Sequence, residues 1–500
     1  MIRKTLAMSA YRKFAKDAGI VGISEIAMKL KPILFLPIIT NALGPSDYGV
    51  YVTLLATTTF VVAFSTLGLN NGLVRFLAAE RDKKTISTGY SSSAFVAFIL
   101  SCTVAAVISL SAGFLANTVF GAPDRADVIQ VGAWYLPLEA LFGLATAFFL
   151  TRQRMLLLSG IRLLDTFVPV AFAILLLLNG YGLYAVVLSM VAVRAVLVAA
   201  EILIILRLVG ISMPRLSIAW SYMRFGLPLV LAMISYTFLN VGDRYIIGLF
   251  LGATSVGIYT VSYTLGSALS IIMAPLSMAL LAPITKSHDE GRPKEVSTYL
   301  SYSLRYYLMF AIPATVGVSV LSIPIITSLA TEAFLVGSYG ITALVAISTL
   351  FYCLFTIYSN VFFLLKRTRN FVTLMAAAAA VNLSLDVLLI PRIGIIGPAF
   401  ATLAAFSMLF VGAFLMTRKH IKIDVDFGFL VKCVLASLVI GLLAYFLRPT
   451  GWINLAMAVA LCVAAYFALL FAMRAFKPHE VHFFKSFLRG KENDLGMSVD

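Results

Sequence analysis

Residues 43–51 read LGPSDYGVY and residues 251–259 read LGATSVGIY, so one nine-residue stretch occurs twice at an offset of 208 residues. Both copies fit the pattern LG-x4-G-[VI]-Y, and long apolar runs flank each of them. Glycine adopts positive φ without steric cost, and tyrosine is favoured where a membrane meets water. The stretch therefore predicts a tight turn between two membrane-spanning helices, in two places along the chain.

A second pair of turn sequences has nearly the same offset. Gly182–Ala185 reads GLYA and Gly394–Gly397 reads GIIG, and they are 212 residues apart. Six expected spans separate the two copies, and an even number gives both halves the same orientation in the membrane. The pattern indicates a parallel repeat about an axis along the membrane normal. The alternative is that short helix hairpins reuse glycine and tyrosine by chance.

Apolar runs as long as a membrane is thick recur along the whole chain. The sequence is 61% hydrophobic and 12% charged, whereas soluble domains carry about 25% charged residues. We therefore expect an all-α integral membrane protein of about 14 transmembrane helices, with two parallel-repeat six-helix lobes plus two C-terminal helices. The expected units are an N-terminal six-helix lobe at 1–210, a C-terminal six-helix lobe at 211–420, two additional transmembrane helices at 421–475 and a cytoplasmic tail at 476–500.

Basic residues fall on one side of the expected helices. Breaks after even-numbered spans, such as RDKK at 81–84, are rich in lysine and arginine. Of the 38 lysines and arginines, only Arg125, Arg392 and Arg448 fall in the odd-numbered breaks. The positive-inside rule then places both termini in the cytoplasm and the chain, as a multi-pass protein, in the cytoplasmic (inner) membrane. The net charge of +16 is thus a topology signal whose partner is anionic lipid, and we expect no nucleic-acid binding.

The sequence contains no motif for a metal ion or a cofactor. The four cysteines lie in apolar spans at unrelated spacings, and no pair of them forms a metal-binding or redox motif. We expect neither a metal nor a cofactor. The first apolar run is full-length, contains charges and lacks a small-residue cleavage site, so we expect it to stay as the first membrane helix.

The turn sequences and their flanks resemble a known family. The matching stretches are LGPSDYGVY at 43–51 with LGLNNGLVRFLAAE at 67–80, DRYIIGLFLGATSVGIYTVSYTLGS at 243–267, and NLSLDVLLIPRIGIIGPAFAT at 382–402. Together with the spans, they are similar to polysaccharide transport proteins, the O-antigen or lipid-linked oligosaccharide flippases of the multidrug/oligosaccharidyl-lipid/polysaccharide exporter superfamily. These motifs concern packing and turns and do not identify the cargo.

The resemblance implies a function. Such proteins move a polyprenyl-pyrophosphate-linked oligosaccharide across the membrane by alternating access, for cell-surface polysaccharides such as the O-antigen of lipopolysaccharide. The implied partners are this lipid, other membrane lipids, a proton or sodium gradient, and polysaccharide polymerase and chain-length proteins. The family often has a second asparagine where this chain has Asp386 after Asn382, so no role is carried over to that position.

Several charged side chains fall inside the expected spans, where each costs roughly 2.5–3.5 kcal/mol at the bilayer centre. Glu139, Asp165 and Arg194 are the deepest, and all three lie in the N-terminal lobe. Arg162 lies three residues before Asp165 and shares its helix face, so the two can form an ion pair.

These charges suit an anionic cargo held in a wet cavity between the lobes. Arginine binds phosphate through paired, planar donors. We assign binding of the pyrophosphate and sugar head to Lys29, Lys31, Arg162 and Arg194. We assign ion coupling or a counter-ion role to Glu25, Glu139 and Asp165. The alternative is that all of these charges form salt bridges that tie helices together.

Further charges in the spans lie nearer the helix ends. Asp243, Arg244 and Asp386 fall in the outer parts of their spans, where structural ion pairs are the favoured interpretation. Arg305 and Lys432 lie within about two turns of the cytoplasmic end, and we expect them to snorkel toward the headgroups.

Two other functions stay open. An ion-coupled multidrug or small-molecule exporter of the same superfamily would favour a cavity of acids and aromatics, whereas here the cations in the spans match the acids in number. A membrane polysaccharide polymerase or ligase would need acid–base or metal-binding residues on a sizeable outer loop, and the outer breaks are short. All four histidines lie in expected cytoplasmic segments, and no P-loop is present. We therefore expect a transporter and not an enzyme.

Overall fold

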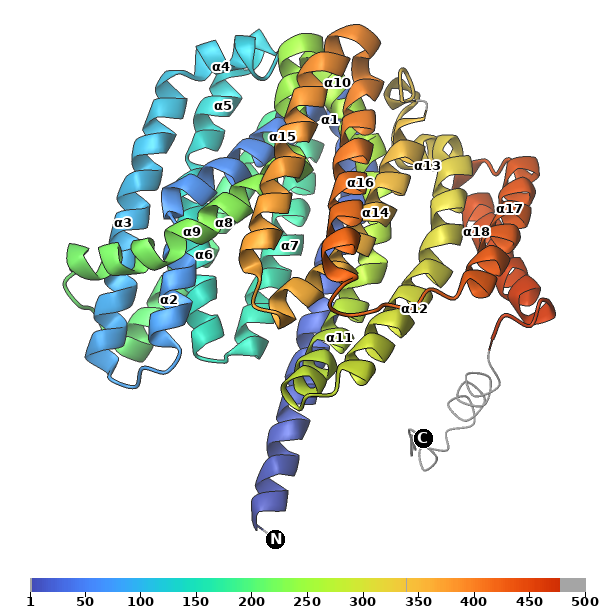
Figure 1. Ribbon diagram of the computed structural model, residues 1–500. Coiled ribbons are helices and arrows are strands. Elements are labelled where there is room, and N and C mark those ends of the chain that lie inside the picture. Colours follow the sequence, from blue (N-terminus) through green and yellow to red (C-terminus); the bar gives the residue numbers. More distant parts are fainter. Residues whose placement is uncertain (1, 339, 477–500) are drawn as a thin grey trace.

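The computed structural model describes residues 2–338 and 340–476, which form α-helices and short 3-10 turns, with no β-strand in these ranges (Figure 1). Within the helices, the side chains outside the description are those of residues 2–23, Glu25, Ile26, Lys29, 228, 229, 232, 274, 278 and 279.

The helices follow one another with short connections. The first half contains α1 (Ile2–Thr66), α2 (Leu69–Leu77), α3 (Lys83–Leu110), α4 (Ala112–Thr118), α5 (Ala126–Ala133), α6 (Tyr135–Thr151), α7 (Met155–Leu178) and α8 (Gly182–Val209). The second half contains α9 (Leu216–Val241), α10 (Asp243–Ser267), α11 (Met273–Asp289), α12 (Pro293–Val320), α13 (Ser322–Leu329), α14 (Ile341–Leu364), α15 (Thr368–Ile393) and α16 (Gly397–Thr417). The last helices are α17 (Phe427–Leu447) and α18 (Gly451–Ala472). The 3-10 turns are η1 (Pro123–Arg125), η2 (Ala268–Ile272), η3 (Glu332–Phe334) and η4 (Gly394–Ile396).

Eleven helical segments in the described residues are long and apolar enough to cross a membrane. Three of them are much longer than one crossing requires: Leu30–Thr66 has 37 residues, Met233–Ser277 has 45 and Thr368–Thr417 has 50, against about 20 for a ~30 Å core. Each of these contains a glycine with positive φ. The all-helical membrane fold is confirmed, while the number of fourteen crossings stays a prediction.

The two copies of the repeated stretch have the same backbone conformation. Gly44 has φ 67° and ψ 177°, and Gly252 has φ 78° and ψ 173°. This region of φ and ψ is open to glycine alone, because a Cβ would clash with the backbone. Gly182 and Gly394, from the second pair, also have positive φ, at 53° and 68°. The predicted glycine turns are therefore present.

The two copies also pack against each other, which the sequence did not indicate. A Cβ built on Gly49 would lie 1.9 Å from the carbonyl oxygen of Ala253, and one built on Gly257 would lie 2.1 Å from that of Pro45. Pro45 and Ala253 occupy equivalent positions in the repeat, as do Gly49 and Gly257. The contact is therefore reciprocal, as a pseudo-twofold axis passing between α1 and α10 requires.

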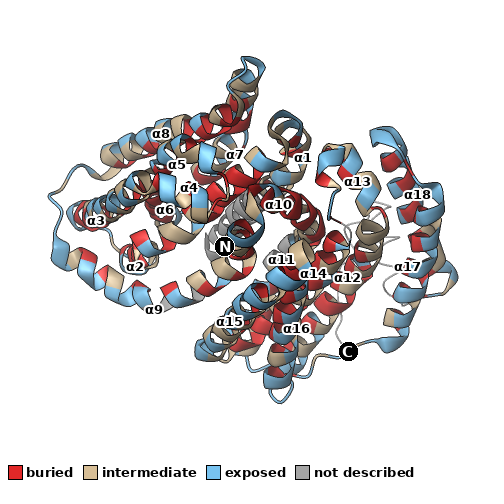
Figure 2. Cartoon of the chain, turned by 90° about the horizontal axis from the view of Figure 1, so that it is seen from above, coloured by how far each residue is buried: buried red, intermediate tan, exposed pale blue. Residues whose placement is uncertain are grey.

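The helices form two groups on either side of α1 and α10 (Figure 2). Helices α2 to α8 lie on one side, and α11 to α16 lie on the other, with α17 and α18 at the outer edge of the second group. Helix α1 packs along α10, and this is the most extensive contact between any two helices. The centre of the molecule is thus the junction between the two copies of the repeat.

Helix α9 belongs to the second half in sequence but packs against α2 and α3 of the first. A Cβ on Gly226 would lie 2.1 Å from the carbonyl oxygen of Gly68, and the rings of Phe76 and Tyr222 stack with centroids 4.9 Å apart. On its other side α9 contacts α15. This helix therefore forms a second link between the halves, separate from the contact of Gly49 and Gly257.

The two ends of the molecule differ in their connections. The N-terminus, the far ends of α2 and α11 and their basic connections lie at one end, and α4 and α13 lie at the other (Figure 1). This is the distribution that the positive-inside rule predicted. The cytoplasmic placement of the termini stays a prediction.

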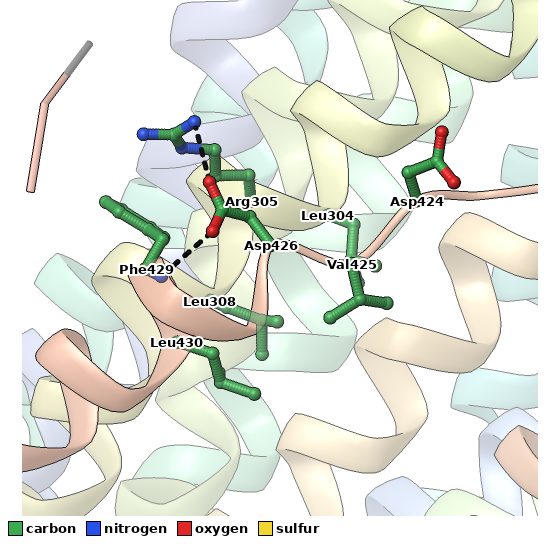
Figure 3. A pocket seen from close by; sticks show the side chains of 8 residues that line it. All are labelled: Leu304, Arg305, Leu308, Asp424, Val425, Asp426, Phe429 and Leu430. Carbon is green, nitrogen blue, oxygen red and sulfur yellow. Dashed lines mark hydrogen bonds and ion pairs between the residues drawn. The ribbon is translucent and has the colours of Figure 1, made fainter.

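The C-terminal helices are fastened to α12 by a buried arginine. Arg305 is 8% exposed, pairs with Asp426 at 3.3 Å and donates a hydrogen bond to the carbonyl of Ala475 at 3.1 Å. Its guanidinium lies 4.2 Å from the centre of the Phe429 ring. Figure 3 shows Arg305 facing Asp426 at the start of α17. The expectation that Arg305 snorkels is therefore wrong, because the segment that joins α16 to α17 supplies a carboxylate in place of the headgroup region.

Candidate functional site

A cavity of about 360 Å³ lies where α6, α7 and α8 of the first group face α1 and α10 at the centre of the molecule. It is lined by residues of α1, α6, α7 and α8 from the first half and by residues of α9 and α10 from the second. Its polar lining includes Lys31, Asp165, Arg194, Arg244, Thr260 and Thr264. Three of these side chains are cationic and one is acidic, so the charged side chains of the lining are mostly basic.

Arg194 is the centre of a charge network on the first-half wall. It forms ion pairs with Glu139 at 2.8 Å and with Asp165 at 3.0 Å. The hydroxyl of Tyr135 accepts a hydrogen bond from Nη2 of Arg194 at 2.5 Å, and the ring of Phe142 lies 4.0 Å from the guanidinium. Arg194 is 7% exposed. The three deepest charges expected from the sequence thus meet, one each from α6, α7 and α8.

Helix α7 places Asp165 at the cavity through its own sequence. Pro169, four residues later, also lines the cavity. Because proline has no N–H, the carbonyl of Asp165 loses its helical hydrogen-bond partner. Both the side chain and the backbone of this residue therefore offer acceptors at the wall of the cavity.

Lys31, on α1, also lines the cavity. Among the described side chains, no carboxylate lies within 4.0 Å of its ammonium. Arg162 lies one turn before Asp165 on α7, is partly buried and is not among the residues that line the cavity. Glu25 and Lys29 lie outside the described side chains. Of the four residues assigned to substrate binding, the structure thus places Lys31 and Arg194 at the cavity.

Arg244 also lines the cavity, and it forms the kind of ion pair that the sequence analysis favoured for it. Its Nη1 contacts Asp243 at 2.5 Å and donates a hydrogen bond to the carbonyl of Asn240 at 2.6 Å. The rings of Tyr263 and Tyr259 lie 4.5 and 5.9 Å from the guanidinium. The sequence signal for this residue was its position, because Arg244 lies in the first turn of the helix that carries the second copy of the repeat.

Behind Arg244 lies a carboxylate without a partner. Asp386, on α15, is 0% exposed, and neither of its oxygens has a hydrogen-bond partner among the described residues. Asp243 lies close enough for its charge to act on Asp386, and its own Oδ2 is likewise unpartnered in the described part of the chain. Asn382, one turn before Asp386, is equally buried. Carboxylate and amide oxygens suit a hard cation or a proton, so this group of residues is a candidate ion site.

Comparison with known proteins gives the family. Residues 38–339 match the family described as Polysaccharide biosynthesis protein. The Probable flippase AglR of Haloferax volcanii is 26% identical over 191 residues, which is 38% of this chain and 39% of that protein. The chain therefore aligns with about two fifths of the length of this relative.

Solved structures give the fold. The lipid II flippase MurJ in an inward closed conformation matches with a TM-score of 0.72 at 14% identity, over 95% of this chain and 100% of MurJ. A multidrug resistance MATE family transporter of the MOP superfamily, in an inward-facing conformation, matches with a TM-score of 0.60 at 16% identity, over 80% of this chain and 97% of that one. At 14% and 16% identity, these TM-scores show a shared fold, and they confirm the predicted fold class. Since the family match spans more than half of its residues, the chain belongs to the polysaccharide biosynthesis protein family, as the resemblance implied.

Proposed function

We propose that this chain is a flippase, and not an enzyme, that moves a polyprenyl-pyrophosphate-linked oligosaccharide across the cytoplasmic membrane for cell-surface polysaccharide biosynthesis. The observation that carries the proposal is the cavity between the halves, which presents Arg194 from one half and Arg244 from the other, with Lys31 beside them. Membership of the family and the likeness to flippases support it.

The cavity arginines are placed so that a phosphate can replace the carboxylates that pair with them. In this conformation Arg194 is neutralised by Glu139 and Asp165, and Arg244 by Asp243. This avoids the large cost of unpaired charge in a low-dielectric interior. A pyrophosphate offers the same planar donors more acceptor oxygens and more charge than a carboxylate, so it can take over the arginines. The lipid tail can stay in the bilayer while the head occupies the cavity.

Transport requires that access to the cavity alternates. We propose that the lobes at 1–210 and 211–420 rock against each other on either side of the junction between α1 and α10. The contact of Gly49 with Ala253 and of Gly257 with Pro45 lies at the turns that we place on the outer side. It closes that side in the present conformation, and the lobes separate there when cargo is released.

Ion coupling is part of the same proposal. Phosphate binding to Arg194 leaves Glu139 and Asp165 without their counter-ion, so a proton or a cation is then favoured at these carboxylates. Asp386 offers a second such site in the other half. Polysaccharide polymerase and chain-length proteins stay predicted partners.

Flipping in proteoliposomes tests the function. A fluorescent disaccharide linked to undecaprenyl pyrophosphate is incorporated in both leaflets, and a membrane-impermeant reductant bleaches only the outer dye. Wild-type protein should make the inner pool accessible, and Lys31→Gln should slow this about tenfold or more, since it removes a charged donor worth about 1.5–3 kcal/mol. Arg392→Gln, an exposed arginine away from the cavity, is the matched control.

The same vesicles separate the alternatives. If the wild type does not flip this lipid, or if it flips equally well a lipid that lacks the pyrophosphate, the proposed cargo is wrong. Accumulation of a cationic dye without lipid flipping would identify a multidrug exporter instead.

A further inference from the structure

A second buried acid lies in the first half, away from the cavity. Glu201, on α8, is 0% exposed, and neither carboxylate oxygen has a hydrogen-bond partner among the described residues. Helix α8 is one of the segments long and apolar enough to cross the membrane. An isolated carboxylate there is strongly unfavourable, and a buried polar group normally has a partner. The sequence analysis did not single out Glu201, because its surroundings AAEILII read as an ordinary apolar run.

The face of α8 that carries Glu201 borders a buried, largely apolar cluster. Val198 and Ile205, on the same face of α8, belong to a buried cluster with residues of α3 and α6. Tyr90, on α3, is the polar member of this cluster that interacts with Glu201. The hydroxyl of Tyr90 is buried and also has no hydrogen-bond partner in the described chain. A protonated Glu201 avoids the cost of a buried negative charge, whereas an ionised Glu201 would have no hydrogen-bond donor among the described residues.

The charged groups that act on Glu201 are Arg194, Asp165 and Glu139, and both acids are ion-paired with Arg194. Arg194 lies seven residues earlier on the same face, about 10 Å along the axis, and is paired with Glu139 from α6 and Asp165 from α7. From α1, Lys31 lines the cavity. At the end of α6, Arg152 donates hydrogen bonds to the carbonyls of Leu77 and Glu80. No ion pair to Glu201 is formed within the described residues.

We infer that Glu201 carries a proton in this conformation and is a proton-binding site of the first half, separate from the substrate cavity. The inference rests on the proposed function for its role in transport. Release of the proton requires a conformation in which water or Arg194 reaches the carboxylate. Because proton affinity at Glu201 then differs between conformations, a proton gradient biases the equilibrium between them.

Infrared spectroscopy tests the protonation without any transport assay. The difference spectrum between wild type and Glu201→Gln at neutral pH should contain the carbonyl band of one protonated carboxylic acid. Tyr90→Phe should keep this band, since the variant removes only a neutral hydroxyl near the carboxyl group. Glu139→Gln, which changes an ion-paired acid, should produce no such band. If the difference spectrum of Glu201→Gln contains no such band, while an unchanged melting temperature shows that the variant is folded, the inference is overturned.

The flipping assay tests the coupling. With an imposed pH gradient, wild-type flipping should accelerate, and Glu201→Gln should lose this acceleration while flipping down a substrate gradient continues. An equal response to the gradient in both proteins contradicts the inference and leaves the flippase proposal standing. If the wild type flips no lipid at all, the flippase proposal fails, and the infrared band still decides the state of Glu201.

Discussion

The two cavity arginines show how the halves of this repeat protein have diverged. Arg194 and Arg244 both lie over aromatic rings and both pair with acids. Arg194 takes its acids from α6 and α7, so it ties three helices together. Arg244 pairs with its own neighbour Asp243, and the buried Asp386 of α15 has no hydrogen-bond partner within the described ranges. At the cavity wall the first half thus pairs both Glu139 and Asp165 with its arginine, while in the second half Asp386 has no hydrogen-bond partner among the described residues.

The largest effect should come from Arg194→Ala. It leaves Glu139 and Asp165 without a counter-ion, and breaking a buried pair costs about 3–5 kcal/mol. We expect roughly 3 kcal/mol, the lower end, because these side chains are 30% and 20% exposed. A much lower melting temperature in detergent would show this. The triple variant with Glu139→Gln and Asp165→Asn should recover most of the loss, and failure to recover would contradict the network.

Gly49→Val and Gly257→Val should each destabilise this conformation by about 2 kcal/mol, the usual cost of overpacking. In each case the new side chain meets a backbone carbonyl that cannot move aside. Gly160→Val, on α7 with no atom within 4 Å of its Cβ position, is the control for helix propensity. Melting temperatures should fall equally in the two variants. An effect in one variant only would show that the contact is not reciprocal.

Arg194→Lys and Arg244→Lys compare the two arginines as phosphate ligands. Each keeps the positive charge and loses the paired planar donors, so we expect flipping of the pyrophosphate lipid to slow about tenfold in both. Initial rates at equal protein density measure this. A loss confined to Arg194→Lys would restrict cargo binding to the first half.

The smallest change in stability should come from Asp386→Asn. An amide in place of an unpartnered buried carboxylate should leave the melting temperature within about 2 °C in ion-free buffer, whereas Asp165→Asn removes an ion pair and should lower it. Any rise in melting temperature on adding sodium should vanish in Asp386→Asn, since a ligand stabilises only the protein that binds it. A sodium response that persists would place the ion elsewhere.

Depth in the membrane could be predicted from the sequence, and lateral position could not. Hydrophobic runs and basic breaks locate each residue along the membrane normal, which is why Glu139, Asp165 and Arg194 were grouped correctly. The spacing of Arg162 and Asp165 shows that they share a helix face, but it does not show which other helix packs against that face. In the structure Asp165 pairs with Arg194 of α8. The structure places these charges at a cavity, and their role in binding stays a proposal.

Other features depend on contacts between segments distant in sequence. The glycine turns were predicted because positive φ is a local property of the chain. The contact between the two turns was not predicted, since it depends on how the two halves pack together. The sequence also does not reveal that the carboxylates of Asp386 and Glu201 have no hydrogen-bond partner in the part of the chain that the structure describes, because a donor would have to come from another helix.

Because α17 and α18 are attached to the second half, they offer a place for a fluorescent reporter of that half. These helices rest on α12 and α13, and Arg305 holds the chain at Ala475. A fluorophore attached to α17 or α18 would follow the second half in the proposed rocking. Paired with a dye on the connection between α6 and α7, it would turn the rocking of single molecules into a change in energy transfer.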